Sequence, residues 1–200
     1  MPESEVNIRE LRDSLKKCVL EQVKIPSGTL TDIVSRFKPL KIEAGNHFTK
    51  PGQVCKEMAY IQDGVMRMYN YADGDEITLW IGSKNRFITD LSSFIHQRSS
   101  RWFIEAVEPS ILLTITREDH YQLISNYHEW IEFDNRLLTS AYTIIEERMF
   151  SHLYMSAEER FKMLLKTEPE LFNKVPLKQI ASMLAMTPET LSRLRAKQMT

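Results

Sequence analysis

Cysteine is scarce in this sequence: Cys18 and Cys55 are the only two among 200 residues. Two thiols are too few for a disulfide framework. They are also too few for a zinc or iron–sulfur site with four thiolates from one chain. A small number of unpaired thiols is typical of proteins in a reducing compartment.

Long apolar runs are also missing. No stretch reaches the 18 or so apolar residues that a membrane-spanning helix needs. The opening PESEVNIRELRD lacks the basic and apolar regions of a secretory signal. We therefore expect a cytoplasmic protein. With 42% hydrophobic and 26% charged residues, the chain can build a real core in one large or two small domains.

The sequence has almost no net charge. Its formal charge is −1, so the protein as a whole is not attracted to a polyanion. Residues 156–200 nevertheless hold eight basic and five acidic side chains, a local charge of +3. Any contact with nucleic acid is therefore expected at this end of the chain.

In the first half of the chain, the spacing of the apolar residues changes once. Helical spacing runs from Val6 to Val23, and a shorter helix is predicted from Thr29 to Phe37. After Pro39 the period becomes two, and turn sequences separate short runs rich in aromatic or branched residues. This pattern predicts an antiparallel barrel or sandwich that ends near Thr116.

A long helix is predicted next. A short helix starts at Thr116, and a second runs from about Tyr127 to Tyr154. Roughly 28 residues span about 40 Å, more than a small barrel needs for its own cover. We expect a homodimer through this helix, although it could instead pack only across its own domains. The expected dimerisation residues are Leu138, Ala141, Ile145 and Met149.

The last 45 residues predict a helix-turn-helix. Ser156 and Glu159 form a capping-box pattern, and LKQIASMLA supplies a helix with one apolar side. A tight turn then leads into PETLSRLRAKQ, with Thr187 as N-cap and Pro188 at the first helical position. The expected fold class is α+β. Its three parts are an N-terminal β-roll over 1–126, a dimerisation helix over 127–155 and a DNA-binding domain over 156–200.

The second helix of a helix-turn-helix lies in the major groove of DNA. Glu189, Ser192 and Arg193 share one helical face here, because they stand three and four residues apart. Arg193 can donate two hydrogen bonds to guanine, and Glu189 can accept one from cytosine. An ordinary solvated face with a Glu189–Arg193 ion pair is the alternative. The candidate DNA-binding residues are Thr187, Glu189, Ser192, Arg193, Arg195 and Lys197.

The order of barrel, long helix and helix-turn-helix resembles the Crp/Fnr family of bacterial transcription regulators. The resemblance runs from about Phe37 to Lys197 and includes EAGNHFTKPGQ, YIQDGVMRMY, DGDEITL and TPETLSRL. It implies a cyclic-nucleotide-binding-like roll and a homodimer on double-stranded DNA. It also implies a palindrome with TTGA-type half-sites, with Arg193 on the guanine and Glu189 on the opposing cytosine. RNA polymerase is a further expected partner.

The effector pocket departs from this resemblance. Family members that bind cyclic nucleotides use Gly, Glu and Arg anchors, and the matching positions here hold Thr89, Asp90 and Ser100. Thr89 adds a side chain where the phosphate needs a bare backbone, and Asp90 is one methylene shorter than Glu. We therefore do not expect cyclic AMP or cyclic GMP; another small effector, or none, is left open. The residues expected to line any cavity are Thr89, Asp90, Arg98 and Arg101.

Two other functions compete with DNA binding. The first is a small-molecule sensing or protein-interaction module with a degenerate cyclic-nucleotide-binding fold and no specific DNA binding. This alternative is suggested by Thr200, which directly follows the last predicted helix. Relatives usually continue there into a wing, a pair of strands that contacts the DNA backbone. The second is a metal-dependent barrel enzyme, for which His47 supplies only one ligand. We see no persuasive catalytic set, and expect no enzyme, metal or cofactor.

Overall fold

A computed structural model describes residues 8–198 of the chain. Val6 and Thr200, which bound two of the predicted segments, lie outside the described residues. The helices are α1 (Ile8–Leu20), α2 (Ser27–Ser35), α3 (Leu91–His96), α4 (Arg117–Asn126), α5 (His128–Tyr154), α6 (Ala157–Thr167), α7 (Leu171–Lys174), α8 (Leu177–Met183) and α9 (Pro188–Gln198). The strands are β1 (Lys38–Ile42), β2 (His47–Thr49), β3 (Glu57–Asp63), β4 (Met66–Ala72), β5 (Asp75–Gly82), β6 (Phe87–Ile88), β7 (Phe103–Ala106) and β8 (Ser110–Thr116).

The strands form two antiparallel sheets of four. One has the order β1-β8-β3-β6 and the other β2-β7-β4-β5. The predicted antiparallel barrel or sandwich is therefore confirmed. Apolar side chains from both sheets, including Ile61, Met68 and Ile104, are buried between them. Gly64 has a φ of +95° in the tight turn between β3 and β4, and an added Cβ would meet Ser110. Glycine is required there.

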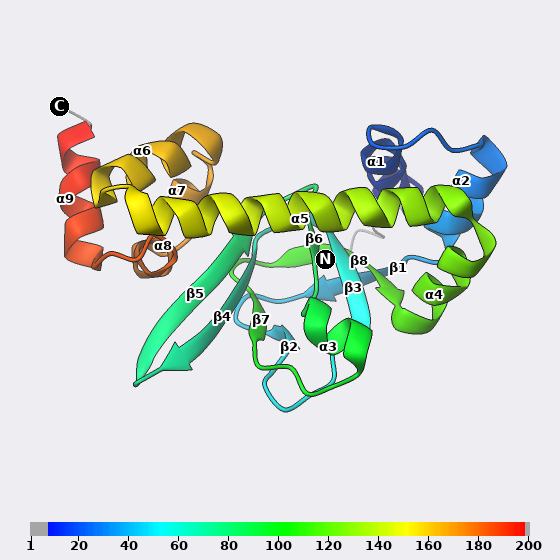
Figure 1. Ribbon diagram of the computed structural model, residues 1–200, viewed down its shortest axis with the longest axis horizontal. Coiled ribbons are helices and arrows are strands. Elements are labelled where there is room, and N and C mark those ends of the chain that lie inside the picture. The colour runs from blue at the N-terminus through cyan, green and yellow to red at the C-terminus, as the bar shows by residue number, and fades with distance from the viewer. Residues whose placement is uncertain (1–7, 199–200) are drawn as a thin grey trace, which may run out of the picture.

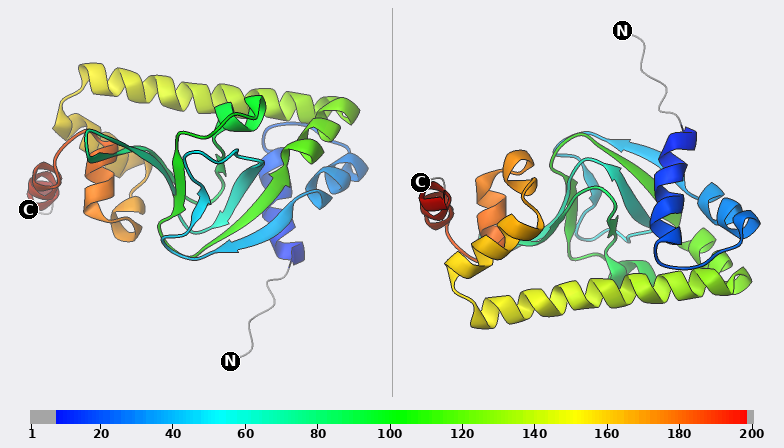
Figure 2. Two further views of the ribbon diagram at one scale, coloured as in Figure 1. Left: turned by 90° about the horizontal axis from the view of Figure 1, so that it is seen from below. Right: turned by 90° about the horizontal axis from the view of Figure 1, so that it is seen from above.

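The long helix α5 crosses the whole molecule (Figure 1). The N-terminal helices and α4 lie near its first half, and the helix-turn-helix lies at its far end (Figure 2). Trp130 and Phe133 of α5 are fully buried and stack with a ring-centroid distance of 5.0 Å. They join the first half of α5 to a core shared with α1, α2 and the roll. No helix within residues 8–198 is long and apolar enough to cross a membrane.

The helix-turn-helix starts two residues after α5. Ser156 caps α6 as predicted: its hydroxyl accepts from the backbone N–H of Glu159, and the Glu159 carboxylate accepts from that of Ser156. The core of this domain includes the buried side chains of Phe161, Ile180 and Leu191. Val65 and Ile81 of the roll belong to the same cluster. The core of the helix-turn-helix is thus continuous with one end of the roll.

Candidate DNA-recognition face and effector site

The helix α9 begins where the sequence predicts. The Thr187 hydroxyl accepts a hydrogen bond from the backbone N–H of Thr190 at 3.2 Å, and Pro188 is the first helical residue. Thr187 therefore satisfies one of the free N–H groups of the first turn. This cap fixes the point at which α9 starts and hence which of its residues point outward.

The two sides of α9 differ sharply in exposure. Leu191 is 0% exposed and sits in the domain core, and Leu194 packs beside it half-buried. Glu189, Ser192 and Arg193 are all exposed. Because they are three and four residues apart, the structure brings these three side chains to one outward face. That pattern matches the geometry of a helix that is seated by leucines and reads bases with polar side chains.

Hydrogen bonding favours the charged form of Glu189. One bond to its own backbone and a second from the Thr187 side chain lower the pKa of this carboxyl group below its ordinary value. An ionised carboxylate has only acceptor sites, so Glu189 is suited to a base that presents an amino group. The cap of α9 and the chemistry of its first outward residue are thus linked.

The remaining basic residues of α9 are also at the surface. Arg195 and Lys197 are exposed, and Lys197 Nζ lies 3.6 Å from the Glu158 carboxylate of α6. Glu158 is held more closely by Lys162, at 2.7 Å. An exposed pair of this kind contributes little to stability, so Lys197 can leave it at little cost.

One residue that holds the helix-turn-helix was missed by the sequence analysis. Arg160 of α6 donates to the carbonyl oxygens of Leu184 at 2.8 Å, Ala185 at 3.2 Å and Met155 at 2.7 Å. Ala185 stands in the turn with a φ of +49°, a strained value for alanine. Arg160 thus stabilises the turn that separates α8 from α9. Nothing in the local pattern around Arg160 points to a turn 24 residues away.

The expected effector residues lie around α3, where two of them are committed to internal hydrogen bonds. Asp90 is 5% exposed; one carboxylate oxygen accepts from the Ser93 N–H at 3.1 Å and the other from the Ser100 hydroxyl at 2.7 Å. The Thr89 hydroxyl donates to the Glu57 carbonyl oxygen at 3.0 Å. Thr89 and Asp90 therefore lie beside α3 with their side-chain oxygens already in internal hydrogen bonds.

The two arginines expected near this site point elsewhere. Arg98 is exposed and donates to the Ser92 hydroxyl, and Arg101 is exposed with its guanidinium 5.1 Å from the Trp102 ring centre. Both lie before the first residue of β7, so neither belongs to that strand. The structure thus does not gather Arg98 and Arg101 around Asp90.

Ser100 is buried and connects Asp90 to Trp102 through hydrogen bonds. It is 3% exposed, its hydroxyl donates to Asp90, and it accepts from the Trp102 N–H at 3.1 Å. The two positions that the resemblance assigns to the Glu and Arg anchors, Asp90 and Ser100, are therefore hydrogen-bonded to each other. Nearby on β5, the Trp80 ring covers Gly82 so closely that an added Cβ would clash with it.

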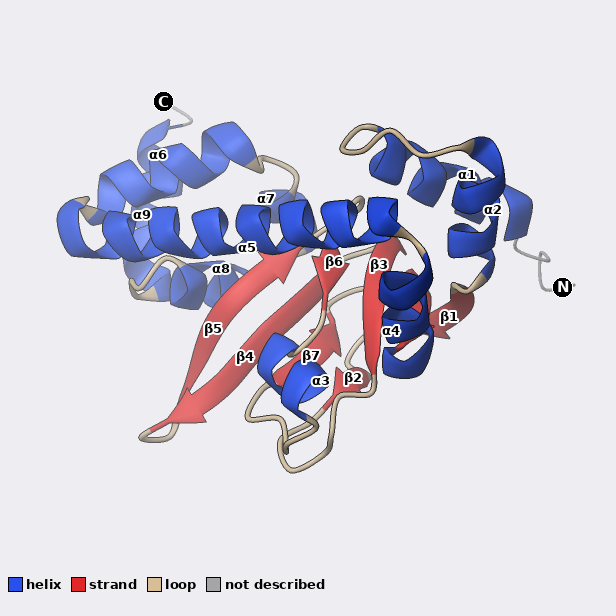
Figure 3. Ribbon diagram, turned by 45° about the vertical axis from the view of Figure 1, so that its right-hand side comes forward, coloured by secondary structure: helices blue, strands red, loops and turns tan. Residues whose placement is uncertain are grey.

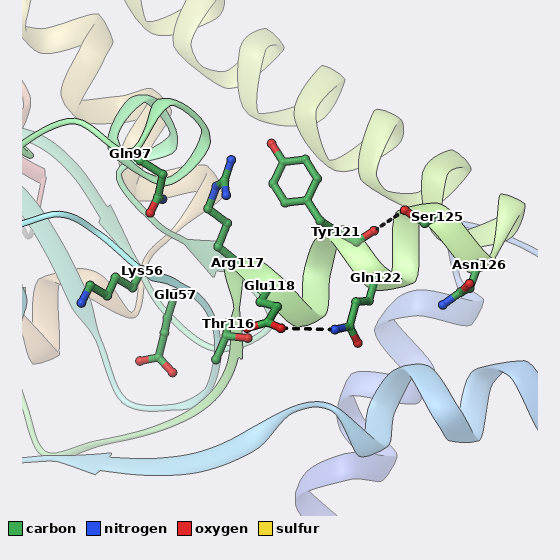
Figure 4. A pocket seen from close by; sticks show the side chains of 10 residues that line it. All are labelled: Lys56, Glu57, Gln97, Thr116, Arg117, Glu118, Tyr121, Gln122, Ser125 and Asn126. Atoms are coloured by element: carbon green, nitrogen blue, oxygen red, sulfur yellow. Dashed lines mark hydrogen bonds between the residues drawn. The ribbon is translucent and has the colours of Figure 1, made fainter.

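A groove of about 1000 Å³ lies outside the roll (Figure 4). It runs between the start of β3, the residue after α3 and one side of α4, and Arg117 stacks there on Tyr121 with 4.5 Å to the ring centre. Its lining residues are Lys56, Glu57, Gln97, Thr116, Arg117, Glu118, Tyr121, Gln122, Ser125 and Asn126. None of the four expected effector residues lines it.

His47, the one barrel histidine that suggests a metal site, has other neighbours. Its Nε2 lies 3.1 Å from the Tyr69 hydroxyl and 3.9 Å from the Glu105 carboxylate. Burial lowers the pKa of His47 below its ordinary value. Glu105 in turn accepts from buried Arg67 at 2.9 Å. These side chains form a polar network on β2, β4 and β7.

The expected dimerisation residues lie on the second half of α5. Ile145 and Met149 are 57% and 60% exposed, Ala141 is exposed, and Leu138 is half-buried. Two large neighbours on the same side were missed: Tyr142 and Leu153, at 66% and 80% exposed. They follow Leu138 at helical spacing, on the side away from fully buried Phe133 and Ser151. Among residues 8–198, nothing in the protomer covers this stripe of large apolar side chains.

Residues 39–127 match the family described as cyclic nucleotide-binding domain. That range covers the roll except Lys38, and it includes the whole of α3 and α4. A search of curated protein sequences found no match.

Solved structures extend the likeness to the C-terminal helices. FixK2 from Bradyrhizobium japonicum has a TM-score of 0.70 at 15% identity, over 80% of this chain and 83% of that one. The c-di-GMP responsive global regulator CLP from Xanthomonas campestris has 0.68 at 15%, over 87% and 92%. A transcriptional regulator of the Crp/Fnr family from Eubacterium rectale has 0.65 at 19%, over 88% and 84%.

Residues 39–127 thus match a cyclic nucleotide-binding domain, and the long helix α5 joins this part to a helix-turn-helix. This is the fold of the Crp/Fnr regulators, and the resemblance read from the sequence is confirmed.

Proposed function

We propose that this protein is a cytoplasmic, dimeric transcription regulator that binds specific DNA sequences through α9 and does not respond to cyclic AMP. The outward face of α9 carries this proposal. Leu191 is fully buried, while Glu189, Ser192 and Arg193 are exposed together on the opposite side. A helix held this way can enter the major groove without disturbing its own core.

The side chains on this face have complementary hydrogen-bonding chemistry. Arg193 can donate two bonds to guanine O6 and N7, and ionised Glu189 can accept from the amino group of a cytosine. Ser192 lies between them and can contact a third base or a phosphate. Arg195 and Lys197 are also exposed, two and four residues beyond Arg193, and they would contact the phosphate backbone. These roles fit a TTGA-type half-site.

The apolar stripe on α5 supports a dimer. Tyr142, Ile145 and Met149 follow one another at spacings of three and four residues, the pattern that packs one helix against its copy. A twofold axis through this contact would present two copies of α9 to two half-sites about one helical turn apart. RNA polymerase is a further partner that we propose for the DNA-bound dimer.

The Asp90–Ser100 pair supports control without a cyclic nucleotide. A cyclic phosphate needs a positive partner and close backbone approach, whereas this site offers a buried carboxylate and a threonine side chain. The negative charge of Asp90 would oppose the phosphate.

Fluorescence anisotropy tests specific binding directly. A labelled duplex with an inverted TTGA repeat is titrated beside a scrambled duplex of the same composition, at physiological salt. We expect clear preference for the repeat. Arg193→Ala should cost about 1–3 kcal/mol, and it should lose most of the preference at the guanine position.

Arg98→Ala is the matched control, because Arg98 is an exposed arginine on the roll, away from α9. It should bind the repeat like the unaltered protein. Equal, weak binding of both duplexes by the unaltered protein would overturn the proposal and favour a module that binds protein or a small molecule. An equal loss on every sequence in Arg193→Ala would show that Arg193 contacts phosphate instead of guanine.

A further inference from the structure

The strand β5 lies at the edge of its sheet, and α8 of the helix-turn-helix lies beside it (Figures 1 and 3). The Ser182 hydroxyl of α8 donates to the Glu76 carbonyl oxygen at 2.8 Å and accepts from the Thr78 N–H at 2.9 Å. One side chain thus satisfies an acceptor and a donor of the edge strand, as a neighbouring strand would. Ser182 joins the two domains through the backbone of β5.

Arg148 of α5 makes a second connection at the same place. Its guanidinium donates to the Leu79 carbonyl oxygen of β5 and, at 2.6 Å, to the Met183 carbonyl oxygen at the end of α8. A cation is favourable at the C-terminus of a helix, where carbonyl groups lack partners. Burial lowers the pKa of Arg148 to about 10, so the group stays charged at neutral pH. Arg148 therefore ties α5, β5 and α8 together.

The covalent link between α5 and α6 does little to fix the orientation of the DNA-binding domain. Only Met155 and Ser156 separate α5 from α6, and both have extended backbone angles. Free rotation about such a link would swing α9 by many ångströms. The contacts of Ser182 and Arg148, together with the apolar contact of Val65 and Ile81 with the domain core, oppose that rotation.

We infer that Arg148 and Ser182 are positioning residues for DNA recognition. They lock α8 onto β5, and α9 is thereby held at one orientation relative to the α5 dimer axis. This inference rests on the proposed function, because only a dimer on two half-sites needs both copies of α9 at a fixed spacing. A domain that is already oriented avoids the loss of rotational freedom on binding.

Amide hydrogen exchange at Thr78 tests the locking without DNA. In the intact protein this N–H is protected by a side chain of another domain instead of by a strand. Ser182→Ala removes that acceptor but leaves the helix and the strand pairing of β4 and β5 in place. We expect Thr78 to exchange about tenfold faster or more, as for a locally opened contact. Ser125→Ala, at an exposed serine of α4, should leave its exchange unchanged.

DNA binding tests the positioning. Ser182→Ala and Arg148→Met are titrated with the inverted repeat and with a duplex holding a single half-site. We expect about tenfold weaker binding of the repeat, and binding of the single half-site within about twofold of the unaltered protein, because α9 itself is unchanged. Arg148→Lys keeps the charge and part of the donor set and should recover part of the loss.

The outcomes separate the two proposals. Unchanged Thr78 exchange in Ser182→Ala would overturn the lock. Faster exchange with unchanged binding of the repeat would overturn the positioning role and leave the proposed function standing. Equal losses on both duplexes would also overturn it, since they indicate damage to α9. If the unaltered protein binds no specific DNA, the proposed function and the positioning role both fail, and Thr78 exchange still decides whether the domains are locked.

Discussion

Removing the buried hydroxyl of Ser100 measures how much the hydrogen bonds of the expected effector site contribute to the stability of the roll. Ser100→Ala removes the donor to Asp90 and the acceptor for the Trp102 N–H, with almost no change in volume. A buried polar group left without a partner costs about 1–3 kcal/mol. Asp90 keeps its bond from Ser93, and Trp102 is only half-buried, so each loss falls in the lower part of that range. We expect the roll to lose about 2–3 kcal/mol of unfolding free energy.

Urea unfolding followed by tryptophan fluorescence is the assay. All three tryptophans, Trp80, Trp102 and Trp130, lie in the roll or in the core it shares with α5, so the signal reports this part of the molecule. Ser125→Ala is the control, with an expected change within about 0.5 kcal/mol. A change as small as the control's in Ser100→Ala would refute the view that these hydrogen bonds hold the site.

The same reasoning is checked by the ligand itself. If Asp90 and Ser100 occupy the site, about 1 mM cyclic AMP should leave the melting temperature of the unaltered protein unchanged. A ligand present at 100 times its Kd would stabilise the folded state by about 2.7 kcal/mol. For a chain of this length that is a rise of roughly 5–10 °C. A rise of that size would show that the roll binds the nucleotide despite its altered anchors.

Three further predictions concern the dimer, the helix-turn-helix and acid stability. Ile145→Asp places a charge in the apolar stripe of α5 and should give a folded monomer by light scattering at concentrations where the unaltered protein is a dimer; a dimer of unchanged mass would contradict that interface. Leu191→Ala should destabilise the helix-turn-helix by about 2–5 kcal/mol through the cavity it leaves, measured by urea unfolding with circular dichroism, and a loss below 1 kcal/mol would argue against its buried position. Burial lowers the pKa of His120 to about 4, so its contribution is complete above about pH 6.5 and is lost as the pH falls toward 4, because the unfolded imidazole takes up a proton first. His120→Gln should remove up to about 3 kcal/mol of that acid-side loss, and an unchanged pH profile of unfolding would show that His120 is not its source.

The local elements were largely predictable from the sequence. The capping box at Ser156, the N-cap at Thr187 and the length of α5 depend on interactions between residues at most a few positions apart. The outward face of α9 follows from the same local rule, because helical spacing alone puts Glu189 and Arg193 on one side. Those predictions agree with the structure because each depends on one element at a time.

The effector site was only half predictable. Sequence alignment with the family's pattern identifies Thr89, Asp90 and Ser100 as altered anchors, but says nothing of where their hydrogen bonds go. The pairing of Asp90 with Ser100 depends on how the segment around α3 folds back before β7. The placement of Arg98 and Arg101 outside this pair depends on the same loop. Loop geometry of this kind is set by tertiary contacts, which have no periodic signal in the sequence.

By itself, the sequence determined the kinds of parts in this protein: a small antiparallel roll, a long helix with an apolar row, and a helix-turn-helix with a polar outward face. Short-range spacing and capping decide these features within each segment. Only the tertiary structure decided that Ser182 and Arg148 join the last domain to β5, and that Arg160 holds the turn before α9. Ser182 and the two arginines bind backbone carbonyl and amide groups, which nearly every residue carries, so no pairing of residue types reveals their partners in advance.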